Sequence, residues 1–280
     1  MKPIIRNSVI IAIIFLMVLL VRLFLVGSYR ITGFTIGDPL KAGDYVLVDK
    51  IKSKPDQNRN RLLLYKSPLR RDVAKPPLFV GRCIGVPGDV IQMGNYGFRV
   101  NGRLLPDAPM MQPMFRIHRD IKVPLLHTLE ALNIPFRQLR EDSTGIILRM
   151  SQREKEVLIS NLSKVVNIEM IEDFTLEYEF VIPAKGKTIV LNEIALLVCQ
   201  EAILNETGPT AVIHEGKLVI QGEEKSSFTF NNDYFWILSE NETEGIDSRH
   251  LGLIPHDHII GTIWYCLYSK DSDNRFKRIK

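Results

Sequence analysis

The sequence has few cysteines, few histidines and little excess of charge of either sign. Its three cysteines, Cys83, Cys199 and Cys266, are far apart and form no CxxC pair. This pattern excludes a disulfide framework and a cysteine-based zinc site, so we expect three small buried apolar side chains. His250, His256 and His258 lack the helical spacing of a metal site, and we expect no metal and no cofactor.

The charge balance also limits the class of partner. Lysine and arginine number 36 against 32 for aspartate and glutamate, which gives a net charge of +4. A surface this close to neutral argues against a dedicated nucleic-acid-binding protein. The chain also lacks an internal repeat and a low-complexity segment. With 280 residues, 45% of them apolar, it is long enough for one large or two small globular domains.

One long apolar run stands at the N-terminus. Lys2 and Arg6 precede a segment from Val9 to Val26 that only Arg22 interrupts. Its length is close to the minimum of about 17–25 residues for a transmembrane helix, and it exceeds the apolar core of a typical signal peptide. A cleaved signal peptide remains the alternative. We predict an uncleaved anchor over residues 1–28, with a cytoplasmic N-terminus and the bulk of the chain on the other side of the membrane.

Most of the remaining sequence is typical of β-strands separated by turns. Gly85-Val86-Pro87-Gly88-Asp89 and Ala42-Gly43-Asp44 are turn sequences, and Asn101-Gly102 is typical of a type I′ hairpin. β-branched and aromatic residues between the turns predict strands at Tyr45–Val48, Leu62–Tyr65, Phe79–Ile84, Val90–Ile91, Phe98–Val100, Phe228–Phe230, Tyr234–Leu238 and Ile259–Tyr268.

The middle of the chain has a different pattern. Two helices are predicted, Pro124–Leu132 with Leu125 and Leu129 on one face, and Glu154–Leu162 with Val157 and Leu158. Strands are predicted around them at Met114–His118, Phe136–Leu139, Gly145–Arg149 and Val166–Ile171. The order β-α-β-β-α-β is that of a ferredoxin-like module. We therefore predict a mainly β domain over residues 29–106 and 180–280, with an inserted α/β module over residues 107–179.

Five segments resemble bacterial type I signal peptidases and occur in the order of that family, behind an anchor in the right place. They are YRITGFTIGDPLKAGDYVLVDK (29–50), NRLLLYKSP (60–68), FVGRCIGVPGDVI (79–91), FRVNG (98–102) and DYFWILSENETEGIDSRHLGLIPHDHIIG (233–261). The corresponding family patterns include S/T-x-S-M, K-R-x-I-G-x-P-G-D and S-x-D-S-R. The resemblance implies a signal-peptidase-type β domain on the outer face of the bacterial inner membrane.

The resemblance also implies where the family's chemistry would lie. Members cut peptides with a serine nucleophile and a neutral lysine as general base. In this sequence the nucleophile position carries Thr35, and the lysine position carries Gly81. The second hydroxyl of the oxyanion hole falls on Gly33, and the serine that orients the lysine falls on Gly245. The aspartate and arginine with a structural role are present as Asp247 and Arg249.

These departures predict a retained fold without the family's chemistry. Glycine cannot accept a proton, so Thr35 has no base at the family position, and losing a general base typically costs about 10²–10⁴-fold in rate. We expect a non-catalytic relative that binds an extended peptide or a protein of the secretion machinery. The alternative is an active signal peptidase that uses Thr35 with an unrecognised base. A third possibility is a structural subunit without a peptide groove.

Overall fold

The computed structural model describes residues 3–20, 25–31, 40–51, 55–69, 76–94, 97–103, 114–132, 137–141, 143–150, 152–162, 168–170, 176–240 and 245–279. Two compact units divide the chain, residues 1–88 with 181–280 and residues 89–180. The second unit begins earlier than the insert expected at 107–179. Strands β5 (Val90–Gly94) and β6 (Gly97–Val100) belong to it because they form a sheet with β11 (Leu176–Val181).

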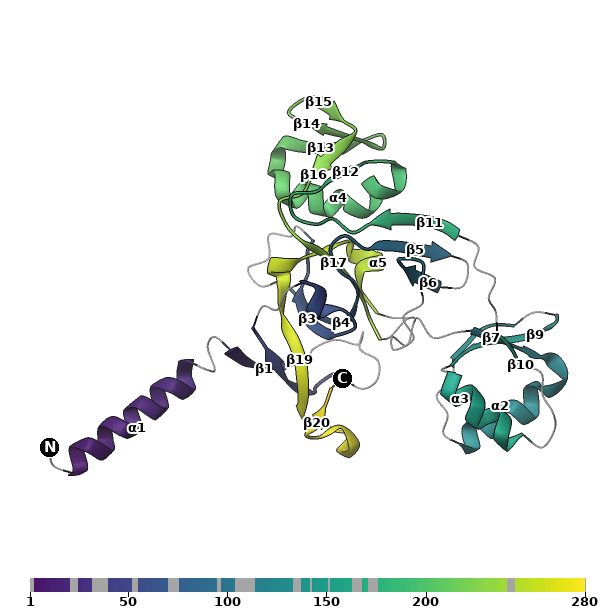
Figure 1. The fold of residues 1–280 in the computed structure, drawn as a ribbon, viewed down its shortest axis with the longest axis horizontal. Helices are drawn as coiled ribbons and strands as arrows, with labels where there is room; N and C mark the ends of the chain where they lie inside the picture. The colour runs from purple at the N-terminus through teal and green to yellow at the C-terminus, as the bar shows by residue number, and fades with distance from the viewer. Residues whose placement is uncertain are drawn as a thin grey trace. The chain divides into compact units, whose positions relative to one another are not determined.

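The first unit is built on one large antiparallel sheet (Figure 1). Its strand order is β1-β2-β19-β3-β4-β17-β18, and β20 pairs with β19. Register shifts in β19 and β17 mark irregularities that bend and twist the sheet. The strands are β1 (Val26–Arg30), β2 (Tyr45–Asp49), β3 (Leu62–Lys66), β4 (Leu78–Gly85), β17 (Tyr234–Leu238), β18 (Ile254–Pro255), β19 (Ile259–Tyr268) and β20 (Lys277–Arg278).

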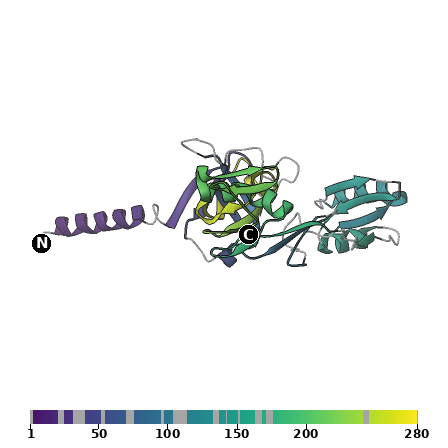
Figure 2. The same ribbon diagram turned by 90° about the horizontal axis from the view of Figure 1, so that it is seen from above.

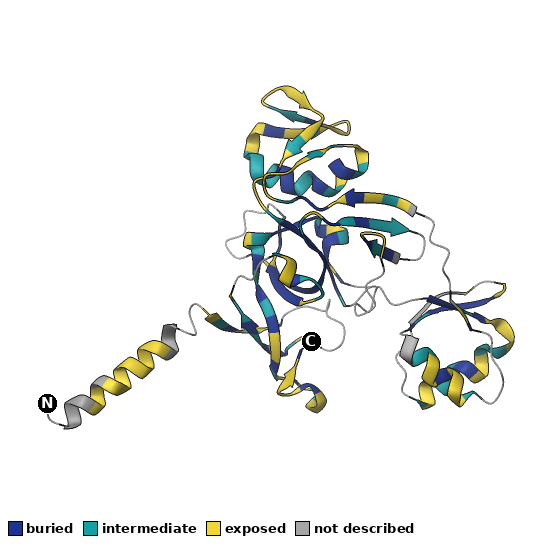
Figure 3. Cartoon of the chain, viewed as in Figure 1, coloured by how far each residue is buried: buried dark blue, intermediate teal, exposed yellow. Residues whose placement is uncertain are grey.

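The sheet is covered on both faces, which explains why its central strands are uniformly apolar. Alternate residues of β3 enter different core clusters: Leu62 and Leu64 enter one, and Leu63 and Tyr65 enter the other. In Figure 3 the strands β3, β4 and β17 are accordingly dark blue over most of their length. A run without polar alternation is the pattern expected of a strand buried on both sides.

Several smaller elements complete the first unit. Helix α4 (Glu193–Thr207) packs against β13 (Ala211–His214), which forms a three-stranded sheet with β14 (Lys217–Ile220) and β15 (Glu223–Lys225). β12 (Thr188–Val190) pairs with β16 (Ser227–Thr229), and a short helix α5 (Ser248–Leu251) follows β17. The sequence did not predict α4 or β11–β15.

The N-terminal apolar segment is partly helical in the described chain. Helix α1 runs over Pro3–Leu20, residues 21–24 lie outside the described residues, and Val26 already begins β1 rather than ending the helix. No helix in the part of the chain that the structure describes has both the length and the apolarity needed to cross a bilayer.

The second unit contains a sheet with two helices on one face (Figures 1 and 2). The strand order is β10-β7-β9-β8, with every neighbouring pair antiparallel. The elements follow one another as β7 (Met114–His118), α2 (Lys122–Ala131), β8 (Arg137–Glu141), β9 (Gly145–Arg149), α3 (Gln152–Asn161) and β10 (Ile168–Met170).

The helices pack largely as the sequence predicted. Leu125, Leu129 and Leu158 are fully buried in one core with Phe115 and Ile146 of the sheet.

The expectation for Val157 is wrong, since its side chain is 41% exposed. Adjacent helical residues point about 100° apart, so the face that buries Leu158 turns Val157 toward solvent.

The turn after β6 has the predicted geometry. Asn101 and Gly102 have φ angles of +52° and +77°, the signs that a type I′ turn requires. Val100 and Arg103 exchange both backbone hydrogen bonds across it, at 2.8 and 3.0 Å. The Asn101 side chain accepts a hydrogen bond from Val90 N and donates one to Asp89. This turn therefore ties β6 back to the start of β5.

Candidate functional site

The structure describes four of the six residues that the resemblance singles out. Thr35 and Gly33 lie outside the described residues. Gly81 lies in β4 and is buried, and Gly245 is buried two residues before Asp247. Gly81 faces Ile237 and Leu238 at the end of β17, and Asp247 binds the next residue of the chain, Ser239. Strand β17 therefore links Gly81 to Asp247.

Gly81 is packed so closely that it leaves no room for a side chain. A Cβ atom built on Gly81 would lie 2.7 Å from the Leu238 carbonyl oxygen and 2.7 Å from Cγ2 of Ile237. The first of these neighbours is backbone within the sheet, and it cannot rotate away as a side chain can. At the position that the resemblance assigns to the lysine, the backbone of β17 thus fills the space that a lysine stem would need.

Asp247, Ser248 and Arg249 join α5 to β17. The fully buried Asp247 carboxylate caps α5 by accepting a hydrogen bond from Arg249 N at 3.0 Å, and it accepts another from Ser239 N at 2.9 Å. The Arg249 guanidinium neutralises this carboxylate through Nε at 2.9 Å and Nη2 at 2.7 Å. Ser248 Oγ accepts a hydrogen bond from Ile237 N at the irregularity of β17.

A second buried ion pair lies next to Gly81. Arg82 donates a hydrogen bond from Nε to Glu240 and another from Nη1 to the carbonyl of Asn60, at 2.9 Å for the latter. The side chains of Arg82 and Glu240 are 10% and 4% exposed. Removing one partner of a buried ion pair leaves the other charge uncompensated, so both partners are needed for stability.

Tyr65 in β3 was not singled out by the sequence and is a buried titratable phenol. Its hydroxyl is buried and has no hydrogen-bond partner among the described residues. Burial raises the pKa of the Tyr65 phenol, and the negative charge of Asp247 raises it further. The phenol is therefore neutral at physiological pH and cannot act as a general base.

The cysteines do not supply a nucleophile either. All three are free and buried, which confirms the sequence-based expectation. Burial raises the pKa of the Cys199 thiol to about 12, so almost no thiolate forms near neutral pH. Among the described residues no three His, Cys, Asp or Glu side chains gather closely enough to hold a metal ion.

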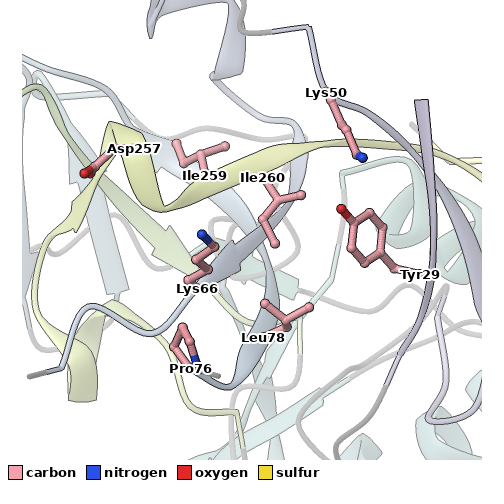
Figure 4. A pocket seen from close by; sticks show the side chains of 8 residues that line it. All are labelled: Tyr29, Lys50, Lys66, Pro76, Leu78, Asp257, Ile259 and Ile260. Atoms are coloured by element: carbon pink, nitrogen blue, oxygen red, sulfur yellow. The ribbon is translucent and has the colours of Figure 1, made fainter. Parts of the chain in front are cut away.

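A pocket of about 590 Å³ opens beside β1 (Figure 4). Its lining comes from β1, from the ends of β2 and β3, from the start of β4 and from the segment around the start of β19. The residues are Tyr29, Lys50, Lys66, Pro76, Leu78, Asp257, Ile259 and Ile260. A second pocket of about 500 Å³ shares Lys66, Pro76 and Asp257 with the first and extends toward Glu206, Tyr234 and His258. The two pockets therefore share part of their lining, and together they are called the hollow below.

Two strand edges border this hollow. β1 is the terminal strand of the large sheet, and no described strand pairs with its outer edge. β17 pairs with β4 only from Arg82 onward, so Leu78–Val80 pair with β3 on one side and with no described strand on the other. Tyr29 of β1 and Leu78 of β4 both line the first pocket. Unpaired backbone groups at a strand edge can accept an added strand.

Comparison with known proteins identifies the family. No curated protein matches the chain. Residues 4–142 match the family described as signal peptidase, peptidase S26. The match includes the first four of the five segments that resemble this family, with Thr35 and Gly81 among them. By this match the chain belongs to the signal peptidase S26 family.

Proposed function

We propose that the protein is a non-catalytic member of the signal peptidase family that holds an extended peptide, or a strand of a secretion-machinery protein, along its open sheet edges. One observation carries the absence of catalysis. The lysine position is occupied by Gly81, and the space around it is closed by the Leu238 carbonyl and Ile237. A site that only lacked its lysine would leave a cavity there, whereas this one is filled by the neighbouring strand.

Three buried groups of the described first unit, Tyr65, Arg82 and Asp247, are unsuited to replace the lysine as a base. Tyr65 stays protonated, and the Arg82 guanidinium is always charged and pairs with Glu240. Asp247 is already bound to Arg249 and to the backbone of Ser239. Neither the protonated Tyr65 phenol nor the charged Arg82 guanidinium can therefore accept a proton.

Peptide binding is supported by the two open edges and by the hollow between them. Main-chain hydrogen bonds to a strand edge give affinity, while pockets beside it select the side chains. β1 and the first half of β4 supply the edges, and the pocket lined by Tyr29 and Leu78 lies beside both. None of these features depends on the catalytic residues.

We further propose that the chain is a single-pass protein of the inner membrane, with its bulk on the periplasmic side. Lys2 and Arg6 precede the apolar segment, and the described side chains from Ile10 to Met17 on α1 are exposed. An apolar helical surface without a covering element favours contact with lipid. N-terminal sequencing of membrane-extracted protein should begin near Met1; a start at or after Ser28 would indicate a cleaved signal peptide.

The inserted unit is proposed to be a ferredoxin-like module. Its element order is β-α-β-β-α-β, its strands are arranged β10-β7-β9-β8, and both helices cover one face. A module of this kind has its own core, here centred on Phe115, Leu125 and Leu158. It can therefore recruit a partner independently of the peptide groove.

The decisive test of the main proposal is a cleavage assay on the full chain purified in detergent. Parent protein and Thr35→Ala are incubated with a radiolabelled preprotein, and the mature product is separated by electrophoresis. We expect no product from either protein above the rate of the preprotein alone. Cleavage by the parent that is absent in Thr35→Ala would refute the proposal and establish an active peptidase with a different base.

A further inference from the structure

The pocket beside β1 combines an apolar floor with two ammonium groups. Pro76, Leu78, Ile259 and Ile260 form the apolar part, and Lys50 and Lys66 contribute the positive charge. Asp257 is the one carboxylate among these lining residues. In Figure 4 it lies at the far end from Lys50, and its oxygens point away from both lysines. The part of the pocket around Lys50 and Lys66 is therefore positively charged.

The Lys50 side chain passes over β1 at Gly27. Its Cε atom lies 2.6 Å from where a Cβ of Gly27 would be, so a side chain at this point of β1 would displace the lysine from this path. Its ammonium then lies 5.8 Å from the ring centroid of Tyr29, within the range of a cation–π contact. The backbone of Lys50 is fixed as well, because its N–H donates to the Leu25 carbonyl at 2.9 Å.

Lys66 reaches the same pocket from a different strand. It ends β3 opposite Leu78 of β4, and its side chain is exposed. Neither lysine forms an ion pair within the described chain that would satisfy its charge. Two cations held on separate strands above an apolar surface match an organic anion better than a hydrated inorganic ion, because the apolar floor offers such an ion no ligands.

We propose that this pocket accepts an acidic side chain of an extended peptide that lies along the edge of β1. The inference rests on the proposed peptide-binding function and adds to it the chemical class of the residue selected. The location supports a peptide, because the pocket adjoins the unpaired edge of β1 and the unpaired start of β4. A bound strand places alternate side chains on one face, and one of these enters the pocket between Lys50 and Lys66.

The expected preference for an acidic over a neutral side chain follows from the exposure of Lys50 and Lys66. Ion pairs at partly exposed sites are individually weak, and two of them together correspond to a gain in affinity of about threefold to tenfold. The gain should fall as salt is added, because exposed charges are screened at high ionic strength.

The experiment uses the detergent-purified full chain and fluorescein-labelled peptides of alternating alanine and valine. In one set a single aspartate occupies each central position in turn, and in the matched set asparagine replaces it. Dissociation constants are measured by fluorescence anisotropy at low and high salt. The variants are the double substitution Lys50→Gln with Lys66→Gln, the substitution Gly27→Ala, which displaces Lys50, and the control Lys187→Gln, an exposed lysine outside both pockets.

We expect the parent and Lys187→Gln to bind one aspartate peptide about threefold to tenfold more tightly than its asparagine partner. The double variant should bind both peptides equally, and Gly27→Ala should retain only part of the preference. Equal affinity of the parent for both peptides would overturn this inference while leaving the proposed function standing. Binding of neither peptide would overturn both.

A competition experiment distinguishes an acidic peptide side chain from an anionic lipid headgroup as the occupant of the pocket. Mixed micelles that contain phosphatidylglycerol are added to the bound peptide, and phosphatidylcholine micelles serve as the control. We expect the two kinds of micelle to displace the peptide equally weakly. Displacement by phosphatidylglycerol alone, lost in the double lysine variant, would assign the pocket to a lipid headgroup and refute the peptide assignment.

Discussion

The substitution Gly81→Ala tests whether the catalytic lysine position is closed by packing. A methyl group at this position would lie 2.7 Å from the Leu238 carbonyl oxygen, well inside the 3.4 Å at which ordinary contact begins. Moving that oxygen means displacing the backbone of β17, which is also fixed by the bond from Ser239 N to Asp247. The strain cannot be relieved by a side-chain rotation.

The magnitude follows from two opposing effects. Overpacking a filled interior costs about 1–3 kcal/mol, whereas replacing glycine by alanine gains about 0.4–1 kcal/mol from the smaller entropy of the unfolded chain. We therefore expect a net loss of about 1–2 kcal/mol in the free energy of unfolding. For a unit of this size the midpoint of thermal unfolding falls by about 2–4 °C per kcal/mol.

Tryptophan fluorescence reports this change selectively. The chain has two tryptophans, Trp236 and Trp264, and both belong to the first unit. Gly27→Ala is the matched control, because its added methyl meets only the side chains of Lys50 and Tyr29, which can move. Gly81→Ala should unfold at a clearly lower temperature than the control. A Gly81→Ala protein as stable as the parent would show that the lysine position is not closed, and the case against catalysis would then rest on the missing base alone.

Three further substitutions test the packing around the site. Asp247→Ala should lower the free energy of unfolding by about 3–5 kcal/mol, because it leaves the buried side of Arg249 unpaired and uncaps α5; tryptophan fluorescence in denaturant measures this, and a loss below 1 kcal/mol would contradict it. Tyr65→Phe should leave stability near neutral pH almost unchanged, because the lost hydroxyl has no described partner. The parent should lose stability above about pH 10, where the unfolded state releases a proton that the raised pKa of Tyr65 retains in the fold, and Tyr65→Phe should weaken that loss; an unchanged pH profile would argue against this origin. Leu125→Ala should destabilise the second unit by about 2–5 kcal/mol, seen by circular dichroism, while the tryptophan signal of the first unit keeps its midpoint; a shift of that midpoint would show that the units unfold together.

Much of the fold follows from local patterns in the sequence. The strands at Met114–His118 and Gly145–Arg149 have the predicted bounds, and the helices between the module's strands begin and end within two residues of their predicted limits. These elements are short, strongly patterned and separated by turn residues. The dipeptide Asn101-Gly102 also predicted its turn, because a type I′ turn needs positive φ at both of its central residues.

The region from 181 to 227 was not predicted because its signals are weaker. Helix α4 begins at a capping residue, Asn192, whose side chain accepts a hydrogen bond from Ala195 N. Its apolar residues are spread around the helix, so no single face stood out. The turns at Glu215-Gly216 and Gln221-Gly222 have the φ signs of type I′ turns, but glutamate and glutamine are unusual at the first position.

The resemblance assigns positions to the candidate site, but the packing around them could not be read from the sequence. It assigns Gly81 to the lysine position, and only the structure shows that Leu238 lies against Gly81. Lys50 and Lys66 are 16 positions apart and belong to different strands, so their shared pocket depends on how the sheet bends. The pairing of Arg82 with Glu240 likewise joins residues 158 positions apart.

The family features that this chain retains are those that set the backbone. Gly88 has a φ of +88°, which a side chain would strain, and Asp247 ties α5 to β17 through its buried carboxylate. By the resemblance, the lysine that falls on Gly81 belongs to the reaction alone, and Leu238 of the neighbouring strand lies against Gly81. In the proposed function, peptide binding depends on neither Gly81 nor Thr35, because strand edges and pocket side chains would supply its contacts. Affinity for the aspartate peptides should therefore be the same in Thr35→Ala and in the parent, and a loss of binding in that variant would place Thr35 in the groove rather than in an abandoned reaction.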